Sequence, residues 1–244
     1  MRFPEWVCIL GLASALLVAP GARADEAPAV ASESSALAPL LAKLGQHAER
    51  FEQMKRRGSF TLNGKMEELD KGGHVDGTKE MILRVVATPA ERKTEILKYL
   101  EDGADKTSEA RQKAEKSRAE KKKKKPRELH LPFLPTEQAK YVFAVAEREA
   151  SRTRVTFHPV TPAETSFKGS AWVDEATGEV LTLGFSPSKN PTFVDHVDIT
   201  MRFDHLTALG RAPSSVTFDA RGGFLVIRKH YRGTVTITDP KLGF

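Results

Sequence analysis

Five acidic and histidine side chains that lie close together in the sequence are the first candidates for chemistry, as ligands of a divalent metal. They are Asp195, His196, Asp198, Asp204 and His205. Imidazole nitrogens and carboxylate oxygens bind such metals when they converge on one point. In a strand over residues 196–204, however, the polar positions alternate with large apolar ones, so one face is polar and the other apolar. We therefore expect an exposed polar face here and no metal site.

Two other chemical motifs are incomplete. Residues 58–65 (GSFTLNGK) look like a phosphate-binding loop, but the two glycines stand one residue too far apart. Met66 also occupies the place of the Ser or Thr that would bind magnesium. No GxSxG nucleophile elbow occurs in the chain. The sequence thus predicts a protein that is not an enzyme and that needs no cofactor.

The first residues, 1–24, have the pattern of a secretory signal peptide. A positively charged start precedes an apolar run over residues 7–19, and Ala22 and Ala24 supply the small residues that signal peptidase requires. The run is shorter than the roughly twenty residues of a membrane span. Cys8 is the only cysteine, so the mature chain contains no disulfide. These features favour a soluble protein of the bacterial periplasm.

The positive charge of the chain is concentrated in one segment, residues 105–128. This segment has eleven Lys or Arg against five acids, and its net charge of +6 equals that of the whole chain. Residues 107–125 are good helix formers, and Pro126 ends them. Two interpretations stay open: a tolerated surface insertion, or docking on an anionic membrane surface. The docking candidates are Lys121, Lys122, Lys123, Lys124 and Lys125. Nucleic acid is not expected, because no aromatic residues interleave the lysines.

The remaining elements are one helix and many strands. After a disordered start, residues 25–34, apolar residues recur at helical spacing from Ser35 to Arg57. Beyond that the period changes to two, and the turn signals include Gly222-Gly223. The predicted strands cover residues 60–69, 75–88, 93–101, 141–147, 153–158, 167–174, 180–186, 196–204, 215–220 and 224–237. Residues 93–101 would also fit a helix, but the turn signal Asp102-Gly103 favours a strand. About ten strands joined by short turns imply an antiparallel sheet.

This sheet has one apolar face that a single helix cannot cover. Ten strands spaced about 4.8 Å apart are almost 50 Å wide, whereas a helix is about 10 Å across. Either the sheet curls until its apolar face packs on itself, or it leaves an apolar cavity for a ligand. The candidate cavity residues, whose facing follows from the alternation, are Leu83, Val85, Leu183, Phe185, Met201 and Phe218.

The most specific family resemblance lies in residues 167–195, FKGSAWVDEATGEVLTLGFSPSKNPTFVD. They are similar to the late hairpin of the LolA-like superfamily of outer-membrane lipoprotein carriers and lipoprotein-sorting proteins. In that hairpin a glycine and a hydrophobic-Val/Ile-Asp strand end precede a turn and a strand that leads to a Lys/Pro segment. The order of elements over most of residues 35–244 is similar too. The resemblance implies an open half-barrel with helices in its mouth and a hydrophobic cavity for acyl chains.

Two features depart from that superfamily. The lysine-rich segment is an insertion, and the nearest match to the superfamily's functional arginine is Arg84. We therefore expect a mainly β (α+β) protein in which residues 35–244 form one curved antiparallel half-barrel with an N-terminal amphipathic helix and an inserted Lys-rich helix. Its expected partner is a lipid or the acyl chain of a lipoprotein. The alternative is a structural or protein-interaction module whose core is filled by its own side chains.

Overall fold

The computed structural model of the chain describes residues 31–121, 131–224 and 227–242. The predicted signal peptide lies outside these ranges, as do Lys122, Lys123, Lys124 and Lys125. The helices are α2 (Ala31–Arg56), α3 (Thr107–Lys121) and α4 (Pro135–Gln138). The strands are β1 (Gly58–Leu69), β2 (Val75–Ala87), β3 (Arg92–Glu101), β4 (Ala104–Asp105), β5 (Tyr141–Glu149), β6 (Arg152–Pro159), β7 (Phe167–Asp174), β8 (Val180–Pro187), β9 (Val194–Arg202), β10 (His205–Thr207), β11 (Gly210–Ala212), β12 (Ser215–Phe224) and β13 (Ile227–Leu242).

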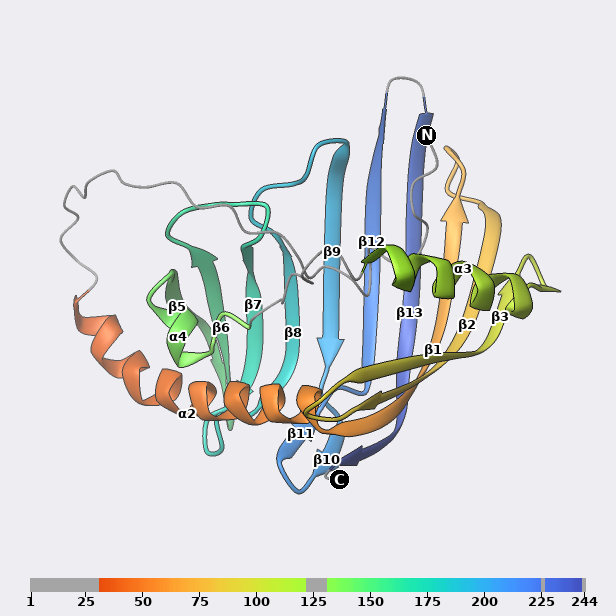
Figure 1. The fold of residues 1–244 in the computed structure, drawn as a ribbon. Coiled ribbons are helices and arrows are strands. Elements are labelled where there is room, and N and C mark those ends of the chain that lie inside the picture. Colours follow the sequence, from red (N-terminus) through yellow and green to blue (C-terminus); the bar gives the residue numbers. More distant parts are fainter. Residues whose placement is uncertain (1–30, 122–130, 225–226, 243–244) are drawn as a thin grey trace.

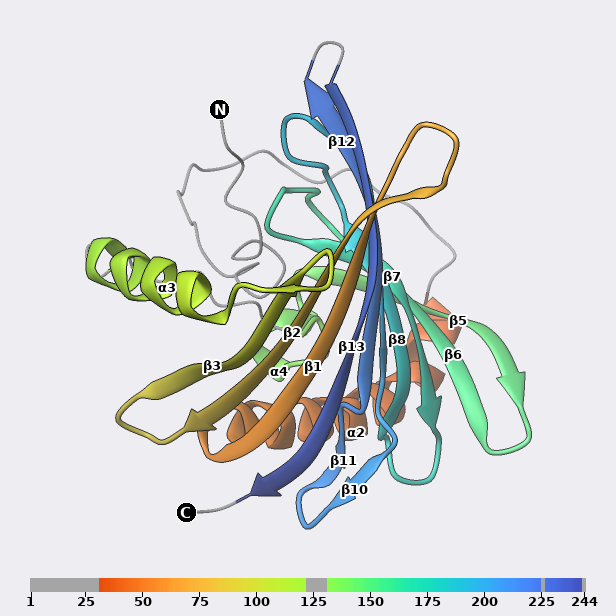
Figure 2. The ribbon, with the colours of Figure 1, turned by 90° about the vertical axis from the view of Figure 1, so that its right-hand side faces the viewer.

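Eleven of the strands form one antiparallel sheet in the order β4-β3-β2-β1-β13-β12-β9-β8-β7-β6-β5. Most neighbours are consecutive in the chain, but β1 pairs with β13 and β12 pairs with β9. Strands β10 and β11 form a separate small hairpin. In the described residues the edge strands β4 and β5 do not pair with each other, so the sheet is curved and unclosed (Figures 1 and 2). This confirms the predicted fold class, a mainly β half-barrel.

The strand register places the large apolar side chains on one common face. Residues that lie opposite each other in an antiparallel pair share a face, and Leu62 lies opposite Leu83. Phe218 likewise lies opposite Ile199. The face that they share, called the inner face here, is the concave side on which α2 lies (Figure 2).

The largest part of the core lies between α2 and strands β5 to β8. Helix α2 buries Leu37, Leu44, Ala48 and Phe51, which recur at three-, four- and seven-residue spacing and so share one side of the helix. They pack in one cluster with residues of the inner face such as Phe157. Phe203 contributes edge-to-face ring contacts with Phe51, at 5.9 Å between centroids. One half of the sheet is therefore covered by the helix.

Four local features differ from the sequence prediction. The pair Gly222-Gly223 is not a turn but lies within β12, opposite Lys229 and Arg228. Gly222 is needed there because a Cβ would collide with the carbonyl oxygen of Phe193. The β10–β11 hairpin and α4 were not predicted, since each is only a few residues long. Helix α2 begins at Ala31 rather than at Ser35.

Candidate functional site

Two side chains hold α2 in place over the inner face. Lys43 donates hydrogen bonds to the carbonyl oxygens of Glu175 (2.8 Å) and Ala176 (3.0 Å), in the turn between β7 and β8. One helical turn further, His47 lies against the start of β8 and against the β10–β11 hairpin. Figure 1 shows that α2 passes across one end of the strands. These contacts attach the helix to the β5–β8 side and to the small hairpin.

The hydrogen bonds of His47 define its protonation state. Its side chain is only 1% exposed. Nδ1 accepts a hydrogen bond from the backbone N–H of Val180 (3.4 Å), and Nε2 lies 3.3 Å from the carbonyl oxygen of Arg211, to which it donates. This pattern requires a neutral ring with its proton on Nε2. Burial lowers the pKa of His47, against the opposing effects of the Arg211 carbonyl and of Glu179.

Beyond α2, the inner face continues over β1, β2, β3, β13, β12 and β9. Two apolar clusters lie there, one around Leu62 and the other around Met66 and Ile199, and neither includes a residue of α2. The side chains at their margins are only half-buried. They are Phe60, Met81, Ile96, Val235 and Ile237 in the first cluster, and Phe185, Val197, Val216 and Tyr231 in the second. This half-buried apolar surface, called the apolar patch here, is the candidate ligand site.

The six cavity residues predicted from the sequence all lie on the inner face, but in different surroundings. Leu83 and Val85 belong to the cluster around Leu62, and Leu183 belongs to the core under α2. Phe218 packs beside Met66 and Ile199. These four side chains are between 1% and 7% exposed, so their neighbours already surround them. Phe185 and Met201 are half-buried and lie where the α2 core meets the rest of the inner face.

Sequence reasoning missed most of the apolar patch. Met81, for example, lies two residues before Leu83 in β2 and shares its face, and Val235 lies opposite Val216. The alternation that selected the six predicted residues would have selected these as well. The alternation does not give the position of α2, and that position determines which inner-face residues are covered.

Arg84 does not reach the inner face. It lies opposite Thr61, one residue from the inward-facing Leu62 and Leu83, and therefore points outward. Its guanidinium donates hydrogen bonds to Thr61 Oγ1 and Ser59 Oγ, both at 3.0 Å. The side chain that the sequence matched to the superfamily's functional arginine therefore stabilises the pairing of β1 and β2 on the outer face.

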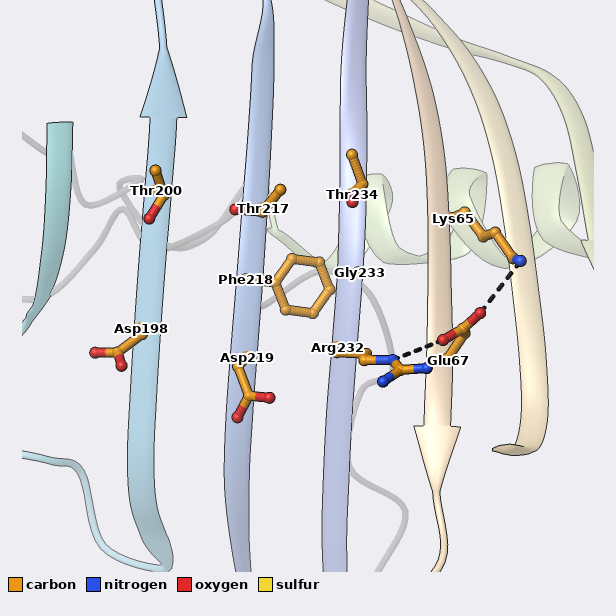
Figure 3. A pocket seen from close by; sticks show the side chains of 10 residues that line it. All are labelled: Lys65, Glu67, Asp198, Thr200, Thr217, Phe218, Asp219, Arg232, Gly233 and Thr234. Atoms are coloured by element: carbon orange, nitrogen blue, oxygen red, sulfur yellow. Dashed lines mark hydrogen bonds and ion pairs between the residues drawn. The ribbon is translucent and has the colours of Figure 1, made fainter. Parts of the chain in front are cut away.

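A polar groove of about 460 Å³ lies on that outer face, across β9, β12, β13 and β1 (Figure 3). Two rows of side chains, each made of residues that lie opposite one another on the four strands, cross the groove. The first row consists of Thr200, Thr217, Thr234 and Lys65, and the second consists of Asp198, Asp219, Arg232 and Glu67. Phe218 and Gly233 lie between the rows and contribute to the floor of the groove.

The charges of this groove are satisfied by their neighbours. Glu67 accepts a hydrogen bond from Arg232 (2.7 Å) and lies 3.2 Å from Lys65, and these contacts lower the pKa of Glu67. Asp198 pairs with His196 at 2.9 Å, and Asp219 pairs with His230 at 2.8 Å. The pairs Arg232–Glu67 and His230–Asp219 join neighbouring strands, and such cross-strand pairs stabilise a solvated sheet face. The groove therefore shows the features of a structural polar surface.

The five candidate metal ligands are divided among different partners. His196 and Asp198 pair with each other, whereas Asp195 pairs with Arg228. Asp204 accepts hydrogen bonds from Ser214 and Arg202, and His205 lies 2.6 Å from the Ile237 carbonyl oxygen. Within residues 31–121, 131–224 and 227–242, no group of three or more His, Cys, Asp or Glu side chains is placed to hold a metal ion.

The inserted helix α3 lies beside β3 and ends at Lys121, the first of the five candidate docking lysines. Lys113 and Lys116, earlier on this helix, are exposed to solvent. Figure 2 shows α3 directed away from the edge of the sheet. None of the helices in the described ranges is long and apolar enough to cross a membrane.

Comparison with solved structures gives matches with low sequence identity and low TM-scores. A domain assigned to outer membrane lipoprotein sorting from Vibrio parahaemolyticus is 12% identical, over 83% of this chain and 91% of its own, with a TM-score of 0.38. A LolA superfamily protein from Nitrosomonas europaea is 11% identical, over 85% and 93%, with a TM-score of 0.33. A DUF1329 family protein from Desulfovibrio piger is 10% identical, over 84% and 93%, with a TM-score of 0.35.

No protein-family model and no curated protein matches the sequence.

Proposed function

We propose that this chain is an exported, non-catalytic binding protein that holds the acyl chain of a lipid or lipoprotein on its apolar patch. The observation that carries the proposal is that the described residues cover only part of the inner face. Helix α2 packs over the β5–β8 half, whereas Phe60, Met81, Val235 and their neighbours keep part of their apolar surface exposed. Contiguous exposed apolar surface of this kind is typical of a binding site.

An acyl chain matches this surface in chemistry. Each CH₂ group removed from water contributes about 0.8 kcal/mol, so a chain of ordinary length can offset the entropic cost of association. The patch consists of aliphatic and aromatic side chains with no acid or base among its members. A neutral hydrocarbon needs no charged partner. We also propose that the lysines of α3 and the segment after it favour approach to an anionic membrane surface.

A pair of adjacent residues provides the direct test. Val235 points to the inner face and Thr234 to the outer face of the same strand. We expect Val235→Arg to abolish uptake of a fluorescent fatty acid, because the guanidinium would have to be buried beside the hydrocarbon. Thr234→Arg should leave uptake unchanged. Circular dichroism would establish that both variants fold.

The second candidate function is a protein-interaction module with a side-chain-filled core. The near-complete burial of Leu83, Val85, Leu183 and Phe218 favours it, since no ligand reaches these side chains without displacing their neighbours. Native mass spectrometry of the exported protein, purified without detergent, separates the two functions. Bound lipid supports the carrier. A ligand-free protein that takes up no acyl probe supports the interaction module and overturns the carrier.

A further inference from the structure

The two edges of the eleven-stranded sheet differ in whether their outward backbone groups are hydrogen-bonded. On one side, beyond the two-residue β4, the edge strand β3 is contacted by residues from the beginning of α3. Arg111 donates hydrogen bonds to the carbonyl oxygens of Ile96 (2.8 Å) and Leu97 (3.3 Å), and the Tyr99 N–H donates to Thr107 Oγ1 (2.9 Å). These contacts satisfy backbone groups that a free edge would offer to another strand.

The other edge strand, β5, has no such contacts within the described part of the chain. Among the described residues, β6 is the strand hydrogen-bonded to β5, and β5 ends the sheet order. Its outer row of N–H and C=O groups therefore faces outward. Natural proteins protect such an edge with charges, prolines or bulges. In β5 the register shift lies between Val145 and Glu147, and the charged residues of the strand begin at Glu147.

The first six residues of β5, YVFAVA, are uncharged and contain neither glycine nor proline. Tyr141, Phe143 and Val145 pack at the margin of the main core. Val142 points to the other face and is 41% exposed. A segment with this composition is suited to pairing with another strand.

We propose that two copies of this protein associate through β5, which pairs with its counterpart in antiparallel orientation across a two-fold axis. Such a dimer uses the same surface twice and closes on itself. An axis through Phe143 places Tyr141 opposite Val145 and Val142 opposite Ala144. No charge then faces a charge within the paired segment, and the inner faces of both sheets lie on the same side. An axis through Ala144 would instead place Lys140 opposite Arg148, a repulsive pair.

The dimer also explains why this edge alone lacks charged protection. A lysine in the first half of β5 would lie on the same face as, and close to, the identical lysine of the second copy, and like charges on paired strands are destabilising. The aromatic cluster of Tyr141, Phe143, Phe133 and Phe157, with ring centroids 5.5 to 6.2 Å apart, lies directly behind the edge. Pairing would bring the two clusters together and extend the covered half of each sheet.

Analytical ultracentrifugation of the exported protein over a range of concentrations tests the association. We expect a reversible dimer whose dissociation constant rises at least about tenfold in Val142→Lys. The matched control is Leu206→Lys, which changes an apolar side chain that is 77% exposed on the β10–β11 hairpin. This control should dimerise as the unmodified protein does. Circular dichroism of both variants separates a lost interface from a lost fold.

Cross-linking tests the register independently. Since Cys8 of the leader is the only cysteine, Val142→Cys combined with Ala144→Cys should form a covalent dimer on oxidation, while Leu206→Cys should not. A protein that stays monomeric at every concentration overturns the proposal. So does a dimer that Val142→Lys leaves intact and that the paired cysteines fail to cross-link, because its interface would then lie elsewhere.

Discussion

Gly233 on β13 lies directly opposite Phe218 on β12, and the aromatic ring occupies the space that a side chain at position 233 would need. A Cβ at this position would lie 2.6 Å from Phe218 Cζ and 2.6 Å from the carbonyl oxygen of Lys65 on β1. Both contacts are far shorter than van der Waals distance. The glycine therefore allows a large ring to cover the backbone in the centre of the sheet.

We expect Gly233→Ala to destabilise the protein by about 1–3 kcal/mol, since the ring could move aside but the Lys65 carbonyl could not without disturbing the pairing of β1 and β13. Gly64→Ala is the matched control on the neighbouring strand, where a Cβ meets nothing closer than 3.7 Å. Urea denaturation of both variants measures the difference. Equal stability of the two variants would contradict this packing.

A second prediction concerns pH. Because burial lowers the pKa of His47, the folded protein binds this proton less tightly than the unfolded chain, whose histidines titrate near pH 6.5. The unfolded state therefore takes up more protons as the pH falls below about 6.5, and the free energy of unfolding decreases toward acid. Protonation would also remove the acceptor for the Val180 N–H and release α2 from β8.

The comparison is with His47→Gln, which does not titrate in this range. We expect the unfolding free energy of the unmodified protein to fall more steeply between about pH 7 and pH 5 than that of the variant. The other histidines and the charged neighbours Arg50, Glu179 and Arg211 are common to both proteins. If the unfolding free energies of the two proteins changed with pH in the same way, titration of His47 would not contribute to the loss of stability in acid.

The alternation of apolar residues was sufficient to predict most of the fold. It gave strands near the observed bounds, as in β9, and it assigned Met201 and Phe218 to one face, where the register places them. It could not give the pairing of β1 with β13, because these are the first and last strands and alternation within a strand does not determine which distant strand pairs with it. Nor could it show the β10–β11 hairpin, which has too few residues to have a period.

The candidate site was less predictable than the fold. The alternation in the sequence selects both Leu183 and Met201, and the two residues lie opposite each other in β8 and β9. Leu183 is nevertheless buried under α2, whereas Met201 is only half-buried. The difference arises from the position of the helix, which depends on hydrogen bonds of Lys43 and His47 to distant backbone. His47 is one of seven histidines, and nothing in its local sequence distinguishes it from the other six.

This difference leads to a third prediction. We expect Leu183→Arg to unfold the protein, because the 2% exposed side chain has no route to solvent and the buried charge costs several kcal/mol. Met201→Arg should fold, with its guanidinium extended to the surface, and should lose uptake of a fluorescent fatty acid. Thermal melting and probe titration measure the two outcomes. If Met201→Arg binds the probe normally, acyl chains do not reach this part of the inner face.

The last prediction concerns the attachment of α3 to the sheet. Arg111 is the residue whose guanidinium connects the helix to the carbonyl oxygens of Ile96 and Leu97. We expect Arg111→Ala to raise the rate of backbone hydrogen exchange in α3 and along β3, because the helix loses these bonds and the strand edge becomes open. The loss of global stability should be small, about 1 kcal/mol, since the contact is at the surface.

Lys113→Ala is the control on the same helix, since Lys113 is exposed and its removal leaves the contact of Arg111 intact. Hydrogen exchange measured by mass spectrometry distinguishes the variants segment by segment. Faster exchange in α3 and β3 of Arg111→Ala alone, with the β5–β8 half unchanged, is the expected pattern. Unchanged exchange in both variants would mean that Thr107 and its bond to Tyr99 are sufficient to hold α3 on the strand.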